Sequence, residues 1–139
     1  MINSDERAEI GSPQAWLVQA QSDLNLARGA RRIEGVLPEQ VAFHAQQCAE
    51  KAVKAVLVAR DVRFPPTHSI QMLADLCEKA GLAVPAFVSE SVELTPYAVG
   101  GRYLELPEPL GETDLDRAIE LAASVLAWAE QQIASQAGS

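Results

Sequence analysis

The chain has 139 residues, of which 48% are apolar, and a formal net charge of −8. This length suits a single domain that buries its own core, and two cysteines without a framework of spacings exclude a secreted disulfide scaffold. The negative net charge argues against nonspecific binding to the phosphates of duplex DNA. The sequence shows neither a signal peptide nor an apolar run of about 20 residues for a membrane span, so we expect a cytoplasmic protein.

Residues 1–11 show no apolar periodicity, and we expect a flexible tail that precedes one domain over residues 12–136. The first helix is predicted to begin at Ser12 and Pro13, because serine caps a helix N-terminus and proline is favoured at the first helical position. The pattern stops near Gly35. The apolar face of this helix repeats at intervals of three and four residues: Trp16, Leu17, Ala20, Leu24 and Ala27.

A second helix is predicted from Pro38 to about Asp61, because no glycine or proline interrupts this stretch. Its apolar face is rich in small residues, which let a neighbouring helix approach closely. We therefore expect this helix at the centre of the fold. The residues of the face are Val41, Ala45, Cys48, Ala49, Ala52, Val53, Val56 and Leu57.

The prolines within residues 63–69 predict a turn that ends in an N-cap at Thr67 or Ser69. A third helix follows and is predicted to stop at Gly81. Its inward residues are Ile70, Leu73, Leu76, Cys77 and Ala80. Residues 85–94 indicate a short helix, and residues 95–111 indicate an irregular connection with one further helical turn.

The last helix is predicted to start at Thr113, which forms a variant of the capping box with Asp116. Its inward stripe consists of Leu115, Ala118, Ile119, Ala122, Val125, Leu126, Ala129 and Ile133. No strand pattern competes with these helices. The predicted fold is all-α, an up-and-down antiparallel bundle of four main helices plus one or two short helices.

Two large apolar residues of the last helix, Leu121 and Trp128, fall opposite its inward stripe. An exposed tryptophan on a helical surface usually marks a partner surface. We therefore predict a homodimer, or a docked partner, that uses this face. The alternative is that residues 1–11 cover it.

The basic residues of the chain cluster in one part of the sequence. Seven of the eleven lie between Arg28 and Arg63, where only four acidic residues occur. On the second helix, four polar side chains share one face at 100° per residue: His44, Gln47, Lys51 and Lys54. Two ammonium groups, an amide and an imidazole in a row suit phosphate and a base edge. The pattern alone favours the alternative, the solvated face of an amphipathic helix.

The segment from Phe43 to Ala55, FHAQQCAEKAVKA, closely resembles the signature second helix of the HEPN family of nucleotide-binding helical bundles. The resemblance covers roughly residues 14–132. Three further tracts resemble the same family in the same order: Trp16-Leu17 with Asp23-Leu24 and Ala27, then Pro66-Thr67-His68-Ser69-Ile70, and then Thr95-Pro96-Tyr97 with Arg102-Tyr103.

The resemblance implies a helical bundle, often dimeric, that binds a nucleotide or a short RNA without a cofactor. It also implies a separate minimal nucleotidyltransferase as partner, in a toxin–antitoxin-like pair. The implied nucleotide-binding residues are His44, Gln47, Lys51, Lys54, Arg102 and Tyr103. Arg102 is expected to clamp a phosphate and Tyr103 to stack on a base.

This function requires that the lysine ridge of the second helix stays open to solvent and faces Arg102 and Tyr103. The alternative without a ligand is a helical, dimeric interaction protein.

A ribonuclease is a weaker alternative. The ribonucleases of the family use an arginine followed, after four to six residues, by a histidine, yet no histidine follows Arg102. Arg63 and His68 match that spacing, but they lie across a proline-rich turn, so we expect no catalytic site. His44 and Cys48 share a helix edge, and two ligands fall short of the four that a zinc site requires, so we expect no metal.

Overall fold

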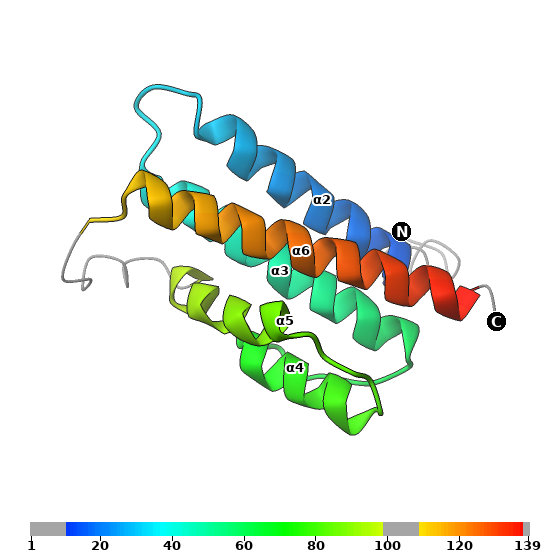
Figure 1. Ribbon diagram of the computed structural model, residues 1–139. Coiled ribbons are helices and arrows are strands. Elements are labelled where there is room, and N and C mark those ends of the chain that lie inside the picture. Colours follow the sequence, from blue (N-terminus) through cyan, green and yellow to red (C-terminus); the bar gives the residue numbers. More distant parts are fainter. Residues whose placement is uncertain (1–10, 99–108, 138–139) are drawn as a thin grey trace.

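The structure is a computed structural model that describes residues 11–98 and 109–137 (Figure 1). Its helices are α2 (Pro13–Ala30), α3 (Pro38–Ala59), α4 (Ile70–Lys79), α5 (Ala86–Glu90), the 3-10 helix η1 (Ser91–Ala98) and α6 (Glu112–Ala137). No strand occurs in the two described stretches, so the predicted all-α class is confirmed. The tail predicted for residues 1–11 lies, except for its last residue, outside the described residues.

The helix starts and stops follow the chemistry read from the sequence. The Ser12 hydroxyl accepts the backbone N–H of Ala15 at 3.1 Å, and the Ser69 hydroxyl accepts that of Met72 at 3.1 Å. Each bond satisfies one of the N–H groups that a helix leaves unpaired at its start. Gly81 follows α4 with φ +89°, a left-handed conformation that costs glycine nothing and therefore suits a helix end.

The start of α6 differs from the predicted capping box. The helix begins at Glu112, and the Asp114 carboxylate accepts the N–H of Gly111 at 2.9 Å. Asp116 instead pairs with Arg31 at the end of α2. The predicted box at Thr113 is therefore absent, because Thr113 lies inside the helix and the return bond of the box is made two residues earlier, between Asp114 and Gly111.

The helices run in two directions. The end of α2 meets the start of α6 through Arg31 and Asp116, so these helices are antiparallel. The ends of α3 and α6 lie together, where Gln136 donates to the carbonyl of Ala59. The connection 60–69 returns along α3, so α4 starts beside the middle of α3 and runs the same way (Figure 1). Helices α2 and η1 therefore run in one direction, and α3, α4 and α6 run in the opposite direction. The predicted up-and-down alternation is interrupted at α4, which runs the same way as the preceding α3.

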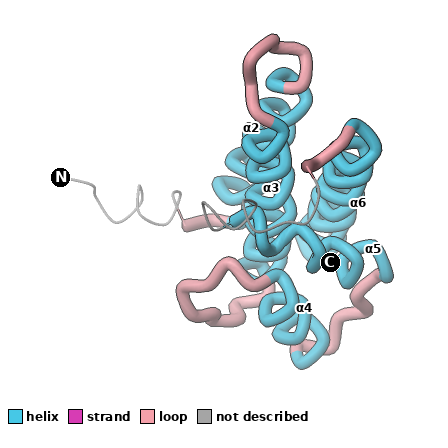
Figure 2. The backbone as a smooth tube through the Cα atoms, turned by 90° about the vertical axis from the view of Figure 1, so that its left-hand side faces the viewer, coloured by secondary structure: helices cyan, strands magenta, loops and turns pink. Residues whose placement is uncertain are grey.

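Helix α3 occupies the centre of the fold, as its small residues predict. It packs against α2, α4, η1 and α6, and the view in Figure 2 shows neighbours on several of its sides. Its residues from Ala45 to Leu57 supply much of the main core, together with side chains of α2, α4 and α6. None of the helices within residues 11–98 and 109–137 combines the length and hydropathy that a bilayer span requires.

Candidate functional site

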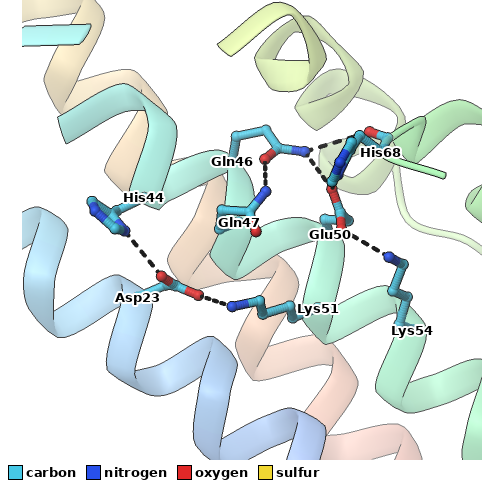
Figure 3. Close-up of polar contacts among 8 residues, drawn as sticks. All are labelled: Asp23, His44, Gln46, Gln47, Glu50, Lys51, Lys54 and His68. Carbon is cyan, nitrogen blue, oxygen red and sulfur yellow. Dashed lines mark hydrogen bonds and ion pairs between the residues drawn. The ribbon is translucent and has the colours of Figure 1, made fainter. Parts of the chain in front are cut away.

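The polar side chains of α3 divide into two clusters, each built around one carboxylate (Figure 3). The first carboxylate is Asp23, contributed by α2. It contacts Nδ1 of His44 at 3.0 Å and accepts from Nζ of Lys51 at 2.8 Å. Because a carboxylate only accepts hydrogen bonds, Nδ1 of His44 donates, and Nε2 remains for another contact. Asp23 thus neutralises Lys51 and fixes the orientation of the His44 ring.

The second carboxylate is Glu50, on α3 itself. It accepts from Nζ of Lys54 at 2.8 Å, from Nδ1 of His68 at 2.9 Å and from the amide of Gln46 at 2.9 Å. Only 3% of the Glu50 side chain is exposed. Burial opposes its ionisation, but the hydrogen bonds from Lys54, Gln46 and His68 together outweigh burial and hold the pKa of Glu50 below its usual value.

Lys54 lies inside the protein rather than on an open ridge. The residue is 8% exposed, and its ammonium lies 5.6 Å from the ring centre of Trp16 and 5.7 Å from that of Phe64. Cation–π attraction therefore adds to the ion pair with Glu50. The prediction of an open lysine ridge is wrong, because Lys51 and Lys54 are both ion-paired with carboxylates and Lys54 is also buried.

The other members of the predicted site have mixed outcomes. Gln47 is half-buried and donates to the amide oxygen of Gln46 at 2.6 Å. Arg102 and Tyr103 lie outside the described residues, so their place relative to α3 stays a prediction. His44 lines a groove beside the end of α2.

A groove of about 470 Å³ opens between the end of α2, the start of α3 and η1. Its walls are mainly apolar, and its polar or charged residues in the described chain are His44, Gln40, Glu39 and Tyr97. Burial, and then the carboxylates of Asp114 and Glu93, raise the pKa of Tyr97, whose hydroxyl is protonated at neutral pH like that of any tyrosine. The lining residues are Leu26, Ala30, Ile33, Val36, Glu39, Gln40, Phe43, His44 and Tyr97.

The interface predicted on α6 is wrong. Trp128 is 5% exposed and Leu121 is 6% exposed, and both belong to the main core. The reason is that α6 packs against α2, α3, α5 and η1 rather than against one neighbour, so residues opposite its inward stripe are also covered.

The residues considered for a ribonuclease site or a metal site have other roles in the structure. His68 donates to Glu50, while Arg63 is exposed on the connection before it. Cys48 is fully buried, its thiol contacts the carbonyl of Ala122 at 3.7 Å, and burial raises its pKa to about 12. Within residues 11–98 and 109–137, no three His, Cys, Asp or Glu side chains gather as a metal site requires.

Three residues that the sequence reading left without a role organise the two clusters: Asp23, Gln46 and Glu50. Glu50 and Lys54 are four residues apart on one helix, a spacing typical of an ion pair, and this signal was available. Asp23 and Lys51 are 28 residues apart and meet only because α2 folds against α3. No pattern within one helix predicts that contact.

Comparisons with known proteins agree on one family. The HEPN domain family model matches residues 13–132. The chain is similar to the crystal structure of ST0689, an archaeal HEPN homologue, with 28% identity and a TM-score of 0.65. It is also similar to the crystal structure of TT1696 from Thermus thermophilus, with 31% identity and a TM-score of 0.70. Each match covers 88% of this chain and 98% of the solved chain. No curated protein matches significantly.

Proposed function

This chain belongs to the HEPN family, and we propose that it is a nucleotide-binding module whose groove at His44 receives the base. The observation that carries the proposal is the groove itself, about 470 Å³ in volume and lined by the rings of Phe43 and Tyr97. That volume lies within the usual range for ligand sites, roughly 300–1,000 Å³. The base belongs to a free nucleotide or to a short single-stranded RNA.

The lining suits a flat ring with a polar edge. Aromatic and aliphatic side chains contact the faces of a base whatever its identity. The Gln40 amide offers both a donor and an acceptor, and Nε2 of His44 offers one more contact. Asp23 fixes the His44 ring through Nδ1 at 3.0 Å, so this contact has a defined direction. Together they favour a nucleobase over a purely aliphatic ligand.

The charges of the site predict which part of the nucleotide supplies the affinity. Among the described residues that line the groove, none is a lysine or an arginine, and Glu39 adds a negative charge. Lys51 and Lys54 are compensated by Asp23 and Glu50. Binding is therefore expected to depend on the base, with adenosine, AMP and ATP differing little in affinity. This replaces the phosphate-binding ridge that the sequence suggested.

The proposal includes a partner. Membership of the HEPN family supports a role beside a separate minimal nucleotidyltransferase, as one half of a toxin–antitoxin-like pair. Such an enzyme handles nucleotides, which suits a module that holds a base. Co-expression of the chain with a minimal nucleotidyltransferase from the same genome tests this part: joint elution supports the pair, and separate elution refutes it.

Isothermal titration calorimetry with adenosine, guanosine, AMP and ATP tests the binding itself. We expect millimolar or tighter binding that Gln40→Ala weakens and His44→Ala weakens further, with Gln71→Ala as the matched control. Gln71 is exposed on α4 and bonds only to Asp75 among the contacts of the described residues. No heat with any ligand at millimolar concentration refutes the proposal. Equal loss in Gln40→Ala and Gln71→Ala refutes the placement in the groove.

A further inference from the structure

The two ring nitrogens of His44 have different surroundings. Nδ1 lies 3.0 Å from Oδ1 of Asp23, whereas Oδ2 of the same carboxylate accepts from Nζ of Lys51 at 2.8 Å (Figure 3). In the part of the chain that the structure describes, His44 forms no further hydrogen bond. The ring of Phe43 lies edge-on to the imidazole, with ring centres 5.0 Å apart, and packs against it. Nε2 is therefore the nitrogen that is available to a ligand in the groove.

The Asp23 carboxylate fixes which nitrogen of His44 carries the proton. A carboxylate only accepts hydrogen bonds, so a neutral imidazole places its single proton on Nδ1 and leaves Nε2 without one. Lys51 pairs with the same carboxylate and neutralises its charge, so Asp23 acts on His44 mainly through this hydrogen bond. In the neutral ring, Nε2 accepts a hydrogen bond and cannot donate one. His44 thus requires a donor from the ligand in the groove.

The neighbours of His44 in the groove complete the hydrogen-bonding pattern. Gln40 precedes His44 by four residues on α3, so the two side chains are neighbours on one face of the helix. The Gln40 amide presents either its donor or its acceptor by turning over, so it adapts to the ligand. The carboxylate of Glu39, in the first turn of α3, is a second acceptor on the groove. Two groups that only accept, without a lysine or arginine in the described lining, favour a ligand edge that carries N–H groups.

We propose that the groove recognises a base by its exocyclic amino group, and that Asp23 is the positioning residue that sets this preference through His44. The inference rests on the proposed base-binding function. The amino group donates to Nε2 of His44, and the Gln40 amide donates to the unprotonated ring nitrogen beside that amino group. Adenine and cytosine carry these two groups side by side. Uracil has a carbonyl oxygen where cytosine has its amino group, so this oxygen and Nε2 are two acceptors without a shared proton.

Isothermal titration calorimetry at about pH 8, where an ordinary imidazole is neutral, compares nucleosides that differ in this amino group. Purine riboside is adenosine without the amino group, and uridine is the counterpart of cytidine with a carbonyl oxygen in its place. We expect the nucleoside without the amino group to bind about tenfold more weakly in each pair, the effect of one lost hydrogen bond. Equal affinities within both pairs overturn the inference and leave the proposed function intact. The absence of binding by all four nucleosides refutes the proposed function, and the inference with it.

Asp23→Asn tests the role of Asp23 by reversing the tautomer of His44. Lys51 can only donate, so the amide of this variant turns its oxygen to Lys51 and its NH₂ group to His44. Nδ1 must then accept, and the proton moves to Nε2, which becomes a donor. We expect the variant to lose the preference for adenosine over purine riboside, whose ring nitrogen still accepts. Asp75→Asn changes an exposed acid on α4 that bonds to Gln71 and is the matched control that keeps the preference. An unchanged preference in Asp23→Asn overturns the inference.

Nitrogen-15 NMR of the histidine rings measures the tautomer directly and needs neither a ligand nor a folded Asp23→Asn variant. The chain has two histidines, His44 and His68, and the ring signals that disappear in His44→Gln belong to His44. In the unchanged chain at about pH 8, we expect Nδ1 of His44 to carry the proton and Nε2 to resonate as an unprotonated nitrogen. A proton on Nε2 in place of Nδ1 overturns the inference.

Discussion

The Glu50 cluster makes a quantitative prediction about folding stability. Glu50→Gln keeps the shape of the side chain but removes its charge, and it leaves the buried ammonium of Lys54 without a counter-ion. Glu50 is 3% and Lys54 10% exposed at the side chain. Breaking a buried ion pair by removing one partner costs about 3–5 kcal/mol, because the other charge stays desolvated. His68 and Gln46 still reach a glutamine oxygen, so we expect the lower end, about 3 kcal/mol.

The double variant Glu50→Gln with Lys54→Met separates charge from packing. It removes both charges and keeps an apolar chain against Trp16 and Phe64, so the cost should fall to about 1 kcal/mol or less. Urea unfolding followed by circular dichroism measures all three variants in a double-mutant cycle. Glu93→Gln is the matched control, because Glu93 pairs with Arg117 at the surface, where ion pairs contribute under about 1 kcal/mol.

Two outcomes would refute this reasoning. If Glu50→Gln costs no more than Glu93→Gln, the Glu50 cluster is not a buried network in solution. If the costs of the two single changes simply add in the double variant, the two charges do not depend on each other, and the loss comes from packing alone.

Three further predictions concern pH, helix capping and the thiols. The folded state lowers the pKa of Glu50 below its ordinary 4.5, so ionised Glu50 contributes fully to folding stability above pH 4.5, and this contribution is lost as the pH falls through the lowered pKa. The free energy of unfolding should therefore fall less steeply with acid in Glu50→Gln than in the unchanged chain. Ser69→Ala removes the cap of α4 and should cost about 1 kcal/mol in urea unfolding, whereas exposed Ser89→Ala should cost under about 0.5. Cys48 and Cys77 should react with a thiol reagent at pH 8 only after unfolding, and fast labelling of the native chain would contradict their burial.

The local sequence predicts the helices well because their ends depend on nearby residues. Helix starts are marked by the capping hydroxyls of Ser12 and Ser69 and by the fixed backbone angles of Pro13 and Pro38. One helix end is marked by Gly81. Each of these effects acts within one helical turn. The all-α class and the central place of α3 follow from the same local patterns and are confirmed.

The candidate site was harder to predict, because periodicity tells which residues share a face and not how many faces are covered. On α3, the side that carries Lys51 and Lys54 lies opposite the apolar stripe, yet other parts of the chain cover it. Trp16 and Phe64 enclose the Lys54 ammonium, and Asp23 reaches Lys51. These partners come from segments far away in sequence.

Trp128 was misplaced for the same reason. A residue opposite the inward stripe is exposed only when a helix has one neighbouring layer. Since α6 packs on several helices, its far side is also core, and Trp128 is buried there.

The attachment of His68 to α3 has a consequence for how this architecture tolerates change. The His68 side chain is anchored on Glu50 and its backbone carbonyl on Gln46, at 2.9 Å and 3.4 Å. The start of α4 is therefore positioned by these two contacts of His68, which lies near the end of the connection 60–69. Val62 and Phe64 earlier in this connection pack against the core, whereas Pro65 and Pro66 are exposed. Extra residues beside these two prolines would lengthen the surface loop while α4 kept its register, which makes this point suitable for inserting a probe or an added segment.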